Sequence, residues 1–261
     1  MDNKTLSRDG TPIAYERHGD GPTVVLVGGA MCTGATLAPL AEALSDRFGA
    51  VTYDRRGRGA SGDTAPFAVA REVEDIAALI DVFGGSAALY GISSGGALAL
   101  EAAMSGLPVR EVAVYETPFA VDEVAGKQRA EYTERLAELL GQGRRGDAVE
   151  LFLALVGTPP EMIAGVRMSH AWPGMEAIAP TLAYDDAAMG ESRVPGERLA
   201  ALSVPLLSVA GDASPAWMRE AALRIAEAAP NGSYRTLEGQ THMVDPGVLA
   251  PVLAEFFRTD G

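Results

Sequence analysis

The stretch Gly91-Ile92-Ser93-Ser94-Gly95 decides the fold of this chain. An apolar run from Ala87 to Tyr90 leads into it, and a helix-like run from Ala97 to Met104 follows it. A serine at a sharp turn between a strand and a helix has a strained backbone, which requires residues without bulk two positions before and two positions after it. Both positions are glycine, so the pattern predicts that Ser93 is a nucleophile presented at such a turn.

The composition is that of a globular protein with a large core. The chain has 261 residues, of which 48% are hydrophobic, and this length suits one large α/β domain that carries an insertion. The formal net charge of -14 repels nucleic acids and anionic membranes, so we expect neither as a partner. We expect a small-molecule substrate, and a monomer or a homodimer.

The location of the protein is predicted from what its sequence lacks. No uninterrupted apolar stretch approaches the roughly 20 residues that span a bilayer. Cys32 is the single cysteine, which excludes an intramolecular disulfide, and the polar run from Met1 to Gly10 has no apolar secretory core. We therefore expect a cytoplasmic protein.

The order of the predicted strands indicates an α/β fold. The turn pair Asp9-Gly10 predicts an antiparallel hairpin at the start, and continuous apolar strands separated by helical patterns predict a parallel sheet covered by helices on both faces. The predicted strands are Lys4 to Ser7, Pro12 to Arg17, Thr23 to Val27, Ala50 to Tyr53, Ala87 to Gly91, Glu111 to Glu116, Pro205 to Gly211 and Ser233 to Leu237. The predicted crossover helices are Thr36 to Ser45, Val69 to Phe83, Ala97 to Ser105, Pro215 to Ala229 and Val248 to Arg258.

The long gap between Glu116 and Pro205 predicts a lid. It exceeds what a single crossover needs and has helical patterns of its own. We therefore predict a core formed by residues 1–117 and 201–261, with a helical lid at 118–200.

A histidine is required because a serine hydroxyl is a poor nucleophile until a base removes its proton. The chain has three histidines: His18 near the N-terminus, His170 in the predicted lid, and His242 after the last strand. His242 fits the order nucleophile, acid, histidine that accompanies a serine at this kind of turn. The alternative for His242 is an exposed loop histidine.

Two backbone N-H groups are expected to stabilise the oxyanion of an attacked carbonyl. Ser94 supplies one, since it follows the nucleophile. The second is predicted in the loop from Gly28 to Met31, where Gly29 lets the backbone approach the substrate and the N-H of Ala30 is the first choice.

These motifs together resemble the α/β-hydrolase superfamily over nearly the whole chain outside the lid. The resemblance rests on Val24 to Met31, on Asp54 to Ser61, on the turn at Ser93, and on Gly239-Gln240-Thr241-His242. It implies a mostly parallel eight-stranded sheet with helices on both faces and an inserted helical lid, and no metal or organic cofactor. Many relatives have a histidine where this chain has Gly28.

The acid that orients His242 has two candidates. Asp212 follows the strand Pro205 to Gly211, the usual region for the family's acid, but the usual spacing places Ser214 there instead. Glu116 ends the preceding strand, as in haloalkane dehalogenases and zearalenone-type lactonases, which it resembles in this respect. We favour Glu116 slightly; a strand-end ion pair for Glu116 and a surface turn for Asp212 are the alternatives.

Other residues are assigned from their positions. Arg55, Arg56 and Arg58 are expected to bond to backbone carbonyls and stiffen their loop. Asp185 and Asp186 are expected in a solvated turn, since no further metal ligands cluster with them. The residues expected to line a substrate pocket are Gly29, Met31, Phe119, Trp172, Met175 and Met243.

The resemblance and the serine nucleophile together imply acyl transfer. We expect a serine hydrolase that cleaves an ester or lactone bond of a small, mostly apolar substrate through an acyl-Ser93 intermediate. The alternatives are hydrolysis of a carbon-carbon bond in a diketone-like substrate, and a ligand-binding or cyclase-like protein that hydrolyses nothing.

Overall fold

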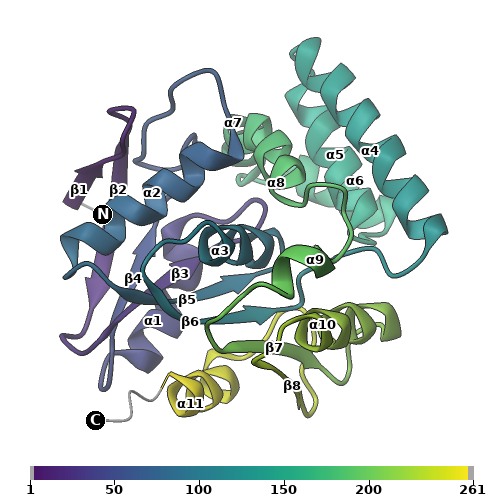
Figure 1. Cartoon of the computed structure of the whole chain (residues 1–261). Coiled ribbons are helices and arrows are strands. Elements are labelled where there is room, and N and C mark those ends of the chain that lie inside the picture. Colours follow the sequence, from purple (N-terminus) through teal and green to yellow (C-terminus); the bar gives the residue numbers. More distant parts are fainter. Residues whose placement is uncertain (1–2, 258–261) are drawn as a thin grey trace.

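Eight strands form one twisted, mostly parallel sheet in the computed structural model of the chain, which describes residues 3–257 (Figure 1). The strand order is β1-β2-β4-β3-β5-β6-β7-β8, in which β2 is antiparallel to both β1 and β4 and all other pairs are parallel. The predicted α/β architecture, with its antiparallel start, is confirmed. The strands are β1 (Asn3–Leu6), β2 (Pro12–His18), β3 (Thr23–Val27), β4 (Gly49–Tyr53), β5 (Ala87–Ile92), β6 (Val109–Tyr115), β7 (Leu206–Gly211) and β8 (Gly232–Leu237).

Residues 1–2 and 258–261 lie outside the described residues. They include Arg258, the predicted end of the last helix, and the outermost residues of the two predicted core ranges.

Helices cover both faces of the sheet and form one apolar layer with each face. On one face, α2 (Val69–Val82), α3 (Ser94–Met104) and α10 (Ala216–Ala228) bury residues such as Leu79, Leu98 and Ile225 against the strands. On the other face, α1 (Ala38–Leu44), which follows the 3-10 turn η1 (Gly34–Leu37), and α11 (Pro246–Phe256) bury Leu40 and Leu253. The strands are apolar on both faces because both faces are covered.

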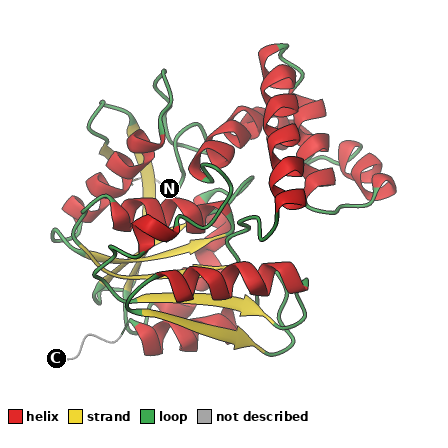
Figure 2. Cartoon of the chain, turned by 45° about the vertical axis from the view of Figure 1, so that its right-hand side comes forward, coloured by secondary structure: helices red, strands yellow, loops and turns green. Residues whose placement is uncertain are grey.

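The chain between β6 and β7 forms a group of helices next to the C-terminal ends of the parallel strands. Helices α4, α5 and α6 stand out from the rest of the molecule in both ribbon views (Figures 1 and 2). Tyr132, Leu136 and Leu139 of α4 pack on Ala148 of α5 and Leu182 of α8, so these helices share a small core of their own. The elements are α4 (Glu123–Gly141), α5 (Arg145–Leu155), α6 (Pro160–Arg167), α7 (Trp172–Ile178), η2 (Ala179–Thr181), α8 (Leu182–Ala188) and α9 (Gly196–Leu199). We call residues 118–200 the lid, and its status as a separate domain stays a prediction.

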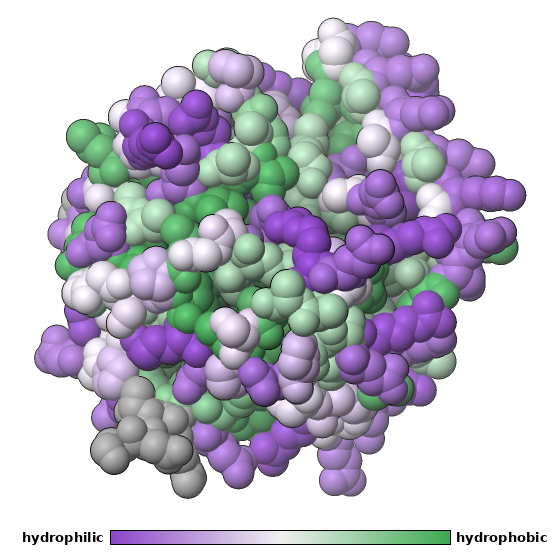
Figure 3. All heavy atoms as spheres, in the orientation of Figure 1, coloured by the Kyte–Doolittle hydropathy of each residue, from purple (hydrophilic) through white to green (hydrophobic). Residues whose placement is uncertain are grey.

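The visible surface is largely hydrophilic. Hydrophilic side chains are spread over the face in Figure 3, with smaller apolar areas between them. Within residues 3–257, no helix combines the length and the apolar character that crossing a membrane requires.

The turn at Ser93 is crowded by backbone on every side. Ser93 has φ 57° and ψ -132°, and helix α3 begins directly after it, three residues earlier than predicted. A Cβ atom on Gly91 would lie 2.3 Å from Gly95 O, and one on Gly95 would lie 2.4 Å from Val27 O. Carbonyl oxygens of the backbone cannot rotate away as a flexible side chain can. Glycine is therefore required at both positions.

Gly95→Ala is expected to destabilise the protein by about 1–3 kcal/mol, because the added methyl group overpacks fixed backbone. Gly165→Ala is the matched control: a Cβ atom on Gly165 would meet nothing within 4 Å beyond the backbone of its own helix α6, and alanine there is expected to stabilise by up to about 1 kcal/mol. Urea unfolding measures both. Equal stability of the two variants would contradict the role given to Gly95.

Candidate active site

A cavity of about 570 Å³ lies between the lid and the C-terminal ends of the strands. Ser93, Ser94 and His242 reach it from the sheet side, and Ala30 reaches it from the loop after β3. Helices α4, α5 and α8 supply its lid-side wall, while α10 supplies Trp217 and Met218. The sheet therefore presents its serine and its histidine to one shared space.

The backbone of Ser93 is fixed by hydrogen bonds on both sides of the turn. Its N-H donates to Tyr115 O of β6 at 2.9 Å, and its carbonyl accepts from Gly96 N at 2.9 Å. Ser94 is the first residue of α3, so its N-H is one of the unpaired donors at a helix start. Such a donor is available to a negatively charged oxygen in the cavity.

The loop after β3 approaches Ser93 closely. A Cβ atom on Gly29 would lie 2.9 Å from Ser93 Cβ and 3.5 Å from Ser93 Oγ. Ala30 follows and lines the cavity, and Met31 has φ 60°, which turns the chain away. The structure thus brings the predicted second oxyanion donor, Ala30, to the same cavity as Ser93 and Ser94.

His242 is paired with Glu116 and not with Asp212. His242 Nδ1 lies 2.9 Å from Glu116 Oε2, and Glu116 Oε1 accepts from Gly211 N at 2.8 Å. The Glu116 side chain is fully buried, whereas that of His242 is 36% exposed. The Tyr115 hydroxyl donates to Thr241 O at 2.7 Å, which ties the histidine loop to the end of β6.

Asp212 has a different contact. It is exposed, and its Oδ1 accepts from Gly239 N at 2.7 Å, where Gly239 has φ 68°. This bond orders the turn that precedes His242. Ser214, at the family's usual position for the acid, is buried but has no carboxylate.

The surroundings of Glu116 favour its ionised form. Burial alone would raise the pKa of this carboxyl, but the hydrogen bonds with His242 and with the Gly211 amide outweigh burial, so its pKa lies below the ordinary value of 4.5. A charged carboxylate at Nδ1 holds the proton on that nitrogen and leaves Nε2 free to accept another.

The predicted pocket residues are corrected by the structure, because most of them pack elsewhere. Phe119 is buried in the sheet core. Trp172 and Met175 pack with Val149 inside the lid, and Met31 of the loop after β3 packs against that cluster. The Met243 side chain is 86% exposed. None of these five predicted residues lines the cavity, and of the predicted set only Gly29 lies next to Ser93.

The residues that do line the cavity come mainly from the lid, where sequence alone carries no signal for the side that faces inward. Tyr132 and Leu182 are visible in the sequence only as apolar residues of lid helices. The lining side chains contributed by the lid and by α10 include Val124, Gln128, Arg129, Tyr132, Phe152, Leu155, Val156, Leu182, Asp185, Asp186, Trp217 and Met218.

The arginines after β4 hold the loop that carries Ala30. Arg55 Nη1 donates to Gly28 O at 3.2 Å, and Arg58 Nη1 donates to Gly29 O at 2.7 Å, which confirms the predicted bonds to carbonyl oxygens. Arg56 also donates to a backbone carbonyl, Arg71 O at 3.1 Å, and pairs with Asp75 at 2.6 Å, but it does not contact that loop.

The prediction that Asp185 lies in a solvated turn is wrong. Asp185 is buried on α8, and it pairs with Arg55 at 2.5 Å and with Arg58 at 2.6 Å. Burial opposes its charge, but the two guanidinium groups outweigh burial and lower the pKa of its carboxyl. Arg55 and Arg58 are 130 and 127 residues away from Asp185 in the sequence, so no local pattern indicates that Asp185 is buried.

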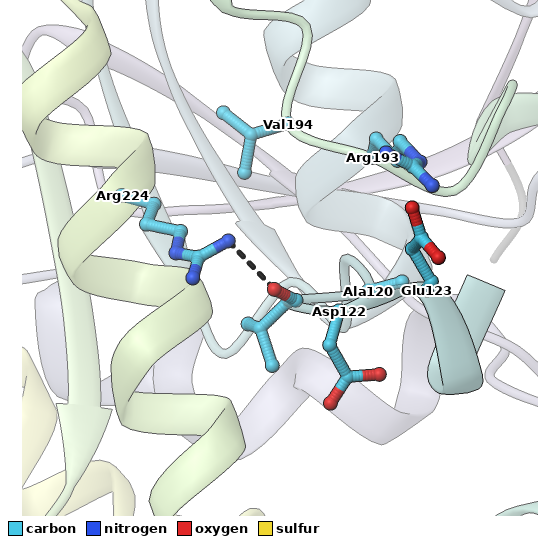
Figure 4. A pocket seen from close by; sticks show the side chains of 7 residues that line it. Ala120, Asp122, Glu123, Arg193, Val194 and Arg224 are labelled. Carbon is cyan, nitrogen blue, oxygen red and sulfur yellow. Dashed lines mark hydrogen bonds between the residues drawn. The ribbon is translucent and has the colours of Figure 1, made fainter.

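A smaller hollow of about 310 Å³ adjoins the cavity where the chain enters the lid (Figure 4). Arg224 donates to Val121 O at 2.7 Å across it, and Arg193 and Glu123 lie on its opposite side (Figure 4). Its charged side chains are exposed to solvent.

Comparisons with known proteins agree on the family. The sequence model of the alpha/beta hydrolase family matches residues 24–252. The structure of an alpha/beta hydrolase from Sphaerobacter thermophilus is 52% identical, covers 98% of this chain and 100% of its own, and has a TM-score of 0.89. This chain therefore belongs to the alpha/beta hydrolase family.

More distant structures share the fold. A thermophilic esterase from Thermogutta terrifontis is 24% identical, with 98% of this chain and 97% of its own covered and a TM-score of 0.73. An enol-lactonase from Burkholderia xenovorans is 21% identical, with 97% and 99% covered and a TM-score of 0.68.

The lowered pKa of Glu116 predicts a pH dependence of stability. The ionised carboxylate contributes stability that is fully present above the ordinary pKa of 4.5 and is lost as the pH falls through the lowered pKa of the folded state. Glu116→Gln removes this contribution. The difference in unfolding free energy between wild type and Glu116→Gln is therefore expected to shrink as the pH falls from about 6 to below 4. A difference that stays constant over this range in denaturant titrations would contradict the assignment.

Proposed function

We propose that this protein is a serine hydrolase that cleaves an ester or lactone bond of a small, mostly apolar substrate. The observation that carries the proposal is the 2.9 Å contact between His242 Nδ1 and Glu116 Oε2, with His242 opening on the cavity that Ser93 lines. A serine, a buried carboxylate and a histidine, in this chain order, suit the roles of nucleophile, orienting acid and base.

The proposed reaction has two acyl-transfer steps. Ser93 Oγ attacks the carbonyl carbon while His242 Nε2 takes its proton, and the N-H groups of Ser94 and Ala30 stabilise the oxyanion that forms. The leaving alcohol takes the proton from His242, which leaves an acyl-Ser93 ester. Water then attacks this ester, with His242 again taking the proton and returning it to Ser93. Glu116 stabilises the imidazolium in both steps.

The lining of the cavity supports an apolar acyl group as substrate. Tyr132, Phe152, Leu155 and Leu182 form an apolar wall on the lid side. The charged pair Arg129 and Asp186, 3.1 Å apart, neutralises itself within that wall. An uncharged substrate therefore fits better than an anionic one. The esterase and the enol-lactonase with this fold make ester and lactone bonds the first substrates to test.

Labelling with a fluorophosphonate tests the nucleophile. We expect one label per chain at Ser93, identified by mass spectrometry, and no label in Ser93→Ala. Ser94→Ala is the matched control and is expected to keep the label, because Ser94 acts through its backbone N-H. A wild type that takes no label, and that hydrolyses no p-nitrophenyl ester, would overturn the proposal in favour of a ligand-binding protein.

Exchanging each carboxylate for its amide distinguishes Glu116 from Asp212. Glu116→Gln is expected to lower kcat for p-nitrophenyl ester hydrolysis by roughly 10³-fold or more, because the imidazole loses its charged partner and the tautomer that it fixes. Asp212→Asn is the control and is expected to lower kcat less than about tenfold, because it removes a bond to the turn at Gly239 only. The reverse ranking would reject Glu116 as the acid.

A further inference from the structure

Arg58 makes four hydrogen bonds with one buried guanidinium group. Its Nη1 donates to Gly29 O at 2.7 Å and to Cys32 O at 3.2 Å. Its Nε donates to Thr181 Oγ1 at 3.0 Å, and its Nη2 donates to Asp185 Oδ2 at 2.6 Å. Four of the five N-H donors of this planar group are therefore used at once, which fixes both the arginine and the groups that it binds.

The carbonyl that Arg58 binds belongs to the peptide group that carries the Ala30 N-H. This peptide bond is trans, so its C=O and its N-H point in opposite directions. With the oxygen directed to Arg58, the N-H is directed away from it, on the side where Ala30 lines the cavity with Ser93. The positive charge of the Arg58 guanidinium beside the Gly29 oxygen also polarises this peptide group, which makes the Ala30 N-H a stronger donor.

Asp185, on lid helix α8, binds both Arg58 and Ser94. One of its oxygens accepts from Arg55 at 2.5 Å and from the Ser94 hydroxyl at 2.9 Å, while the other accepts from Arg58. Ser94 carries the other proposed oxyanion N-H. The Asp185 carboxylate on α8 thus holds both the side chain of Ser94 and Arg58, which binds the Gly29 carbonyl.

We infer that Arg58 is a positioning residue that orients and strengthens the Ala30 N-H through the Gly29 carbonyl, and that Asp185 couples the lid helix α8 to both oxyanion donors. The inference rests on the proposed function, since an oxyanion forms only if Ser93 attacks a carbonyl. Both residues act through the groups that they hold. Their effect falls on the transition state, in which the oxyanion exists, and not on the bound ester.

The kinetic test compares Arg58→Met with Arg56→Met. Arg56 is equally buried, lies in the same loop and is also ion-paired, but it does not contact the loop that carries Ala30. For p-nitrophenyl butyrate, Arg58→Met is expected to lower kcat roughly 10- to 100-fold with KM within about threefold, since a weakened donor costs less than a lost one. Arg56→Met is expected to keep kcat within about threefold while losing stability. Equal kcat losses in the two variants would mean that Arg58 is merely structural, and would overturn the inference.

A spectroscopic test reads the Ala30 amide without any turnover. The sequence has five Gly-Ala pairs, so full-length protein labelled with carbonyl-¹³C glycine and ¹⁵N alanine gives five correlated amide signals. Arg58→Met is expected to move the Ala30 amide proton upfield, and Arg56→Met to leave it in place. An Ala30 signal that does not respond to Arg58→Met would overturn the inference.

Asp185→Asn keeps the inference testable if Arg58→Met does not fold. This substitution retains the shape of the side chain but removes the negative charge of the carboxylate to which Arg58 and the Ser94 hydroxyl donate. We expect the same loss of kcat at nearly constant KM, and a shift of the Ala30 amide. Asp75→Asn is the control, because Asp75 is equally buried but pairs with Arg56, away from the cavity, and it is expected to change neither. Unchanged kcat and an unchanged amide in Asp185→Asn would contradict the coupling. If wild type shows no Ser93-dependent hydrolysis, the proposed function fails, while the amide signal still decides what Arg58 does.

Discussion

The backbone turn at Ser93 constrains everything around it. Gly91 and Gly95 have no side chains, so β5, the start of α3 and the loop after β3 can lie in direct backbone contact. This contact brings Ser94 at the helix start and Ala30 of the loop to the cavity that Ser93 lines. The proposed oxyanion donors are backbone groups that need no particular side chain, so a glycine at position 28 is compatible with the proposal.

The second constraint is the position of Glu116, a buried carboxylate that directly follows β6, the strand beside β5. Glu116 has φ 45°, and its N-H donates to Val209 O, so the end of β6 directs the carboxylate across β7 toward the loop that carries His242. The Gly211 amide holds one oxygen and the imidazole holds the other. Glu116 after β6 thus makes the contact with His242, while Asp212 after β7 accepts from the Gly239 amide and Ser214 has no carboxylate.

The fold could be predicted from local patterns, because each strand and each crossover helix is encoded within about ten residues. The start of α3 could not, since serine and glycine are poor helix formers and tertiary packing determines that first turn. In the site, Ser93 and His242 follow from motif and chain order. The sequence favours Glu116 over Asp212 only slightly, because both carboxylates follow a strand and only packing decides which one reaches His242. The cavity wall does not follow from motif or chain order, because which face of α4 or α8 turns inward depends on packing between helices distant in sequence. Asp185 is the clearest case: alone it is typical of a solvated turn, and only Arg55 and Arg58 make its burial favourable.

The imidazole of His242 is expected to share its Nδ1 proton with the carboxylate of Glu116, 2.9 Å away. Proton NMR of the resting protein in water tests it most directly. We predict a far-downfield N-H resonance that is present in wild type and in Asp212→Asn, and absent from both His242→Ala and Glu116→Gln. A resonance that survives in Glu116→Gln but disappears in Asp212→Asn would contradict the account.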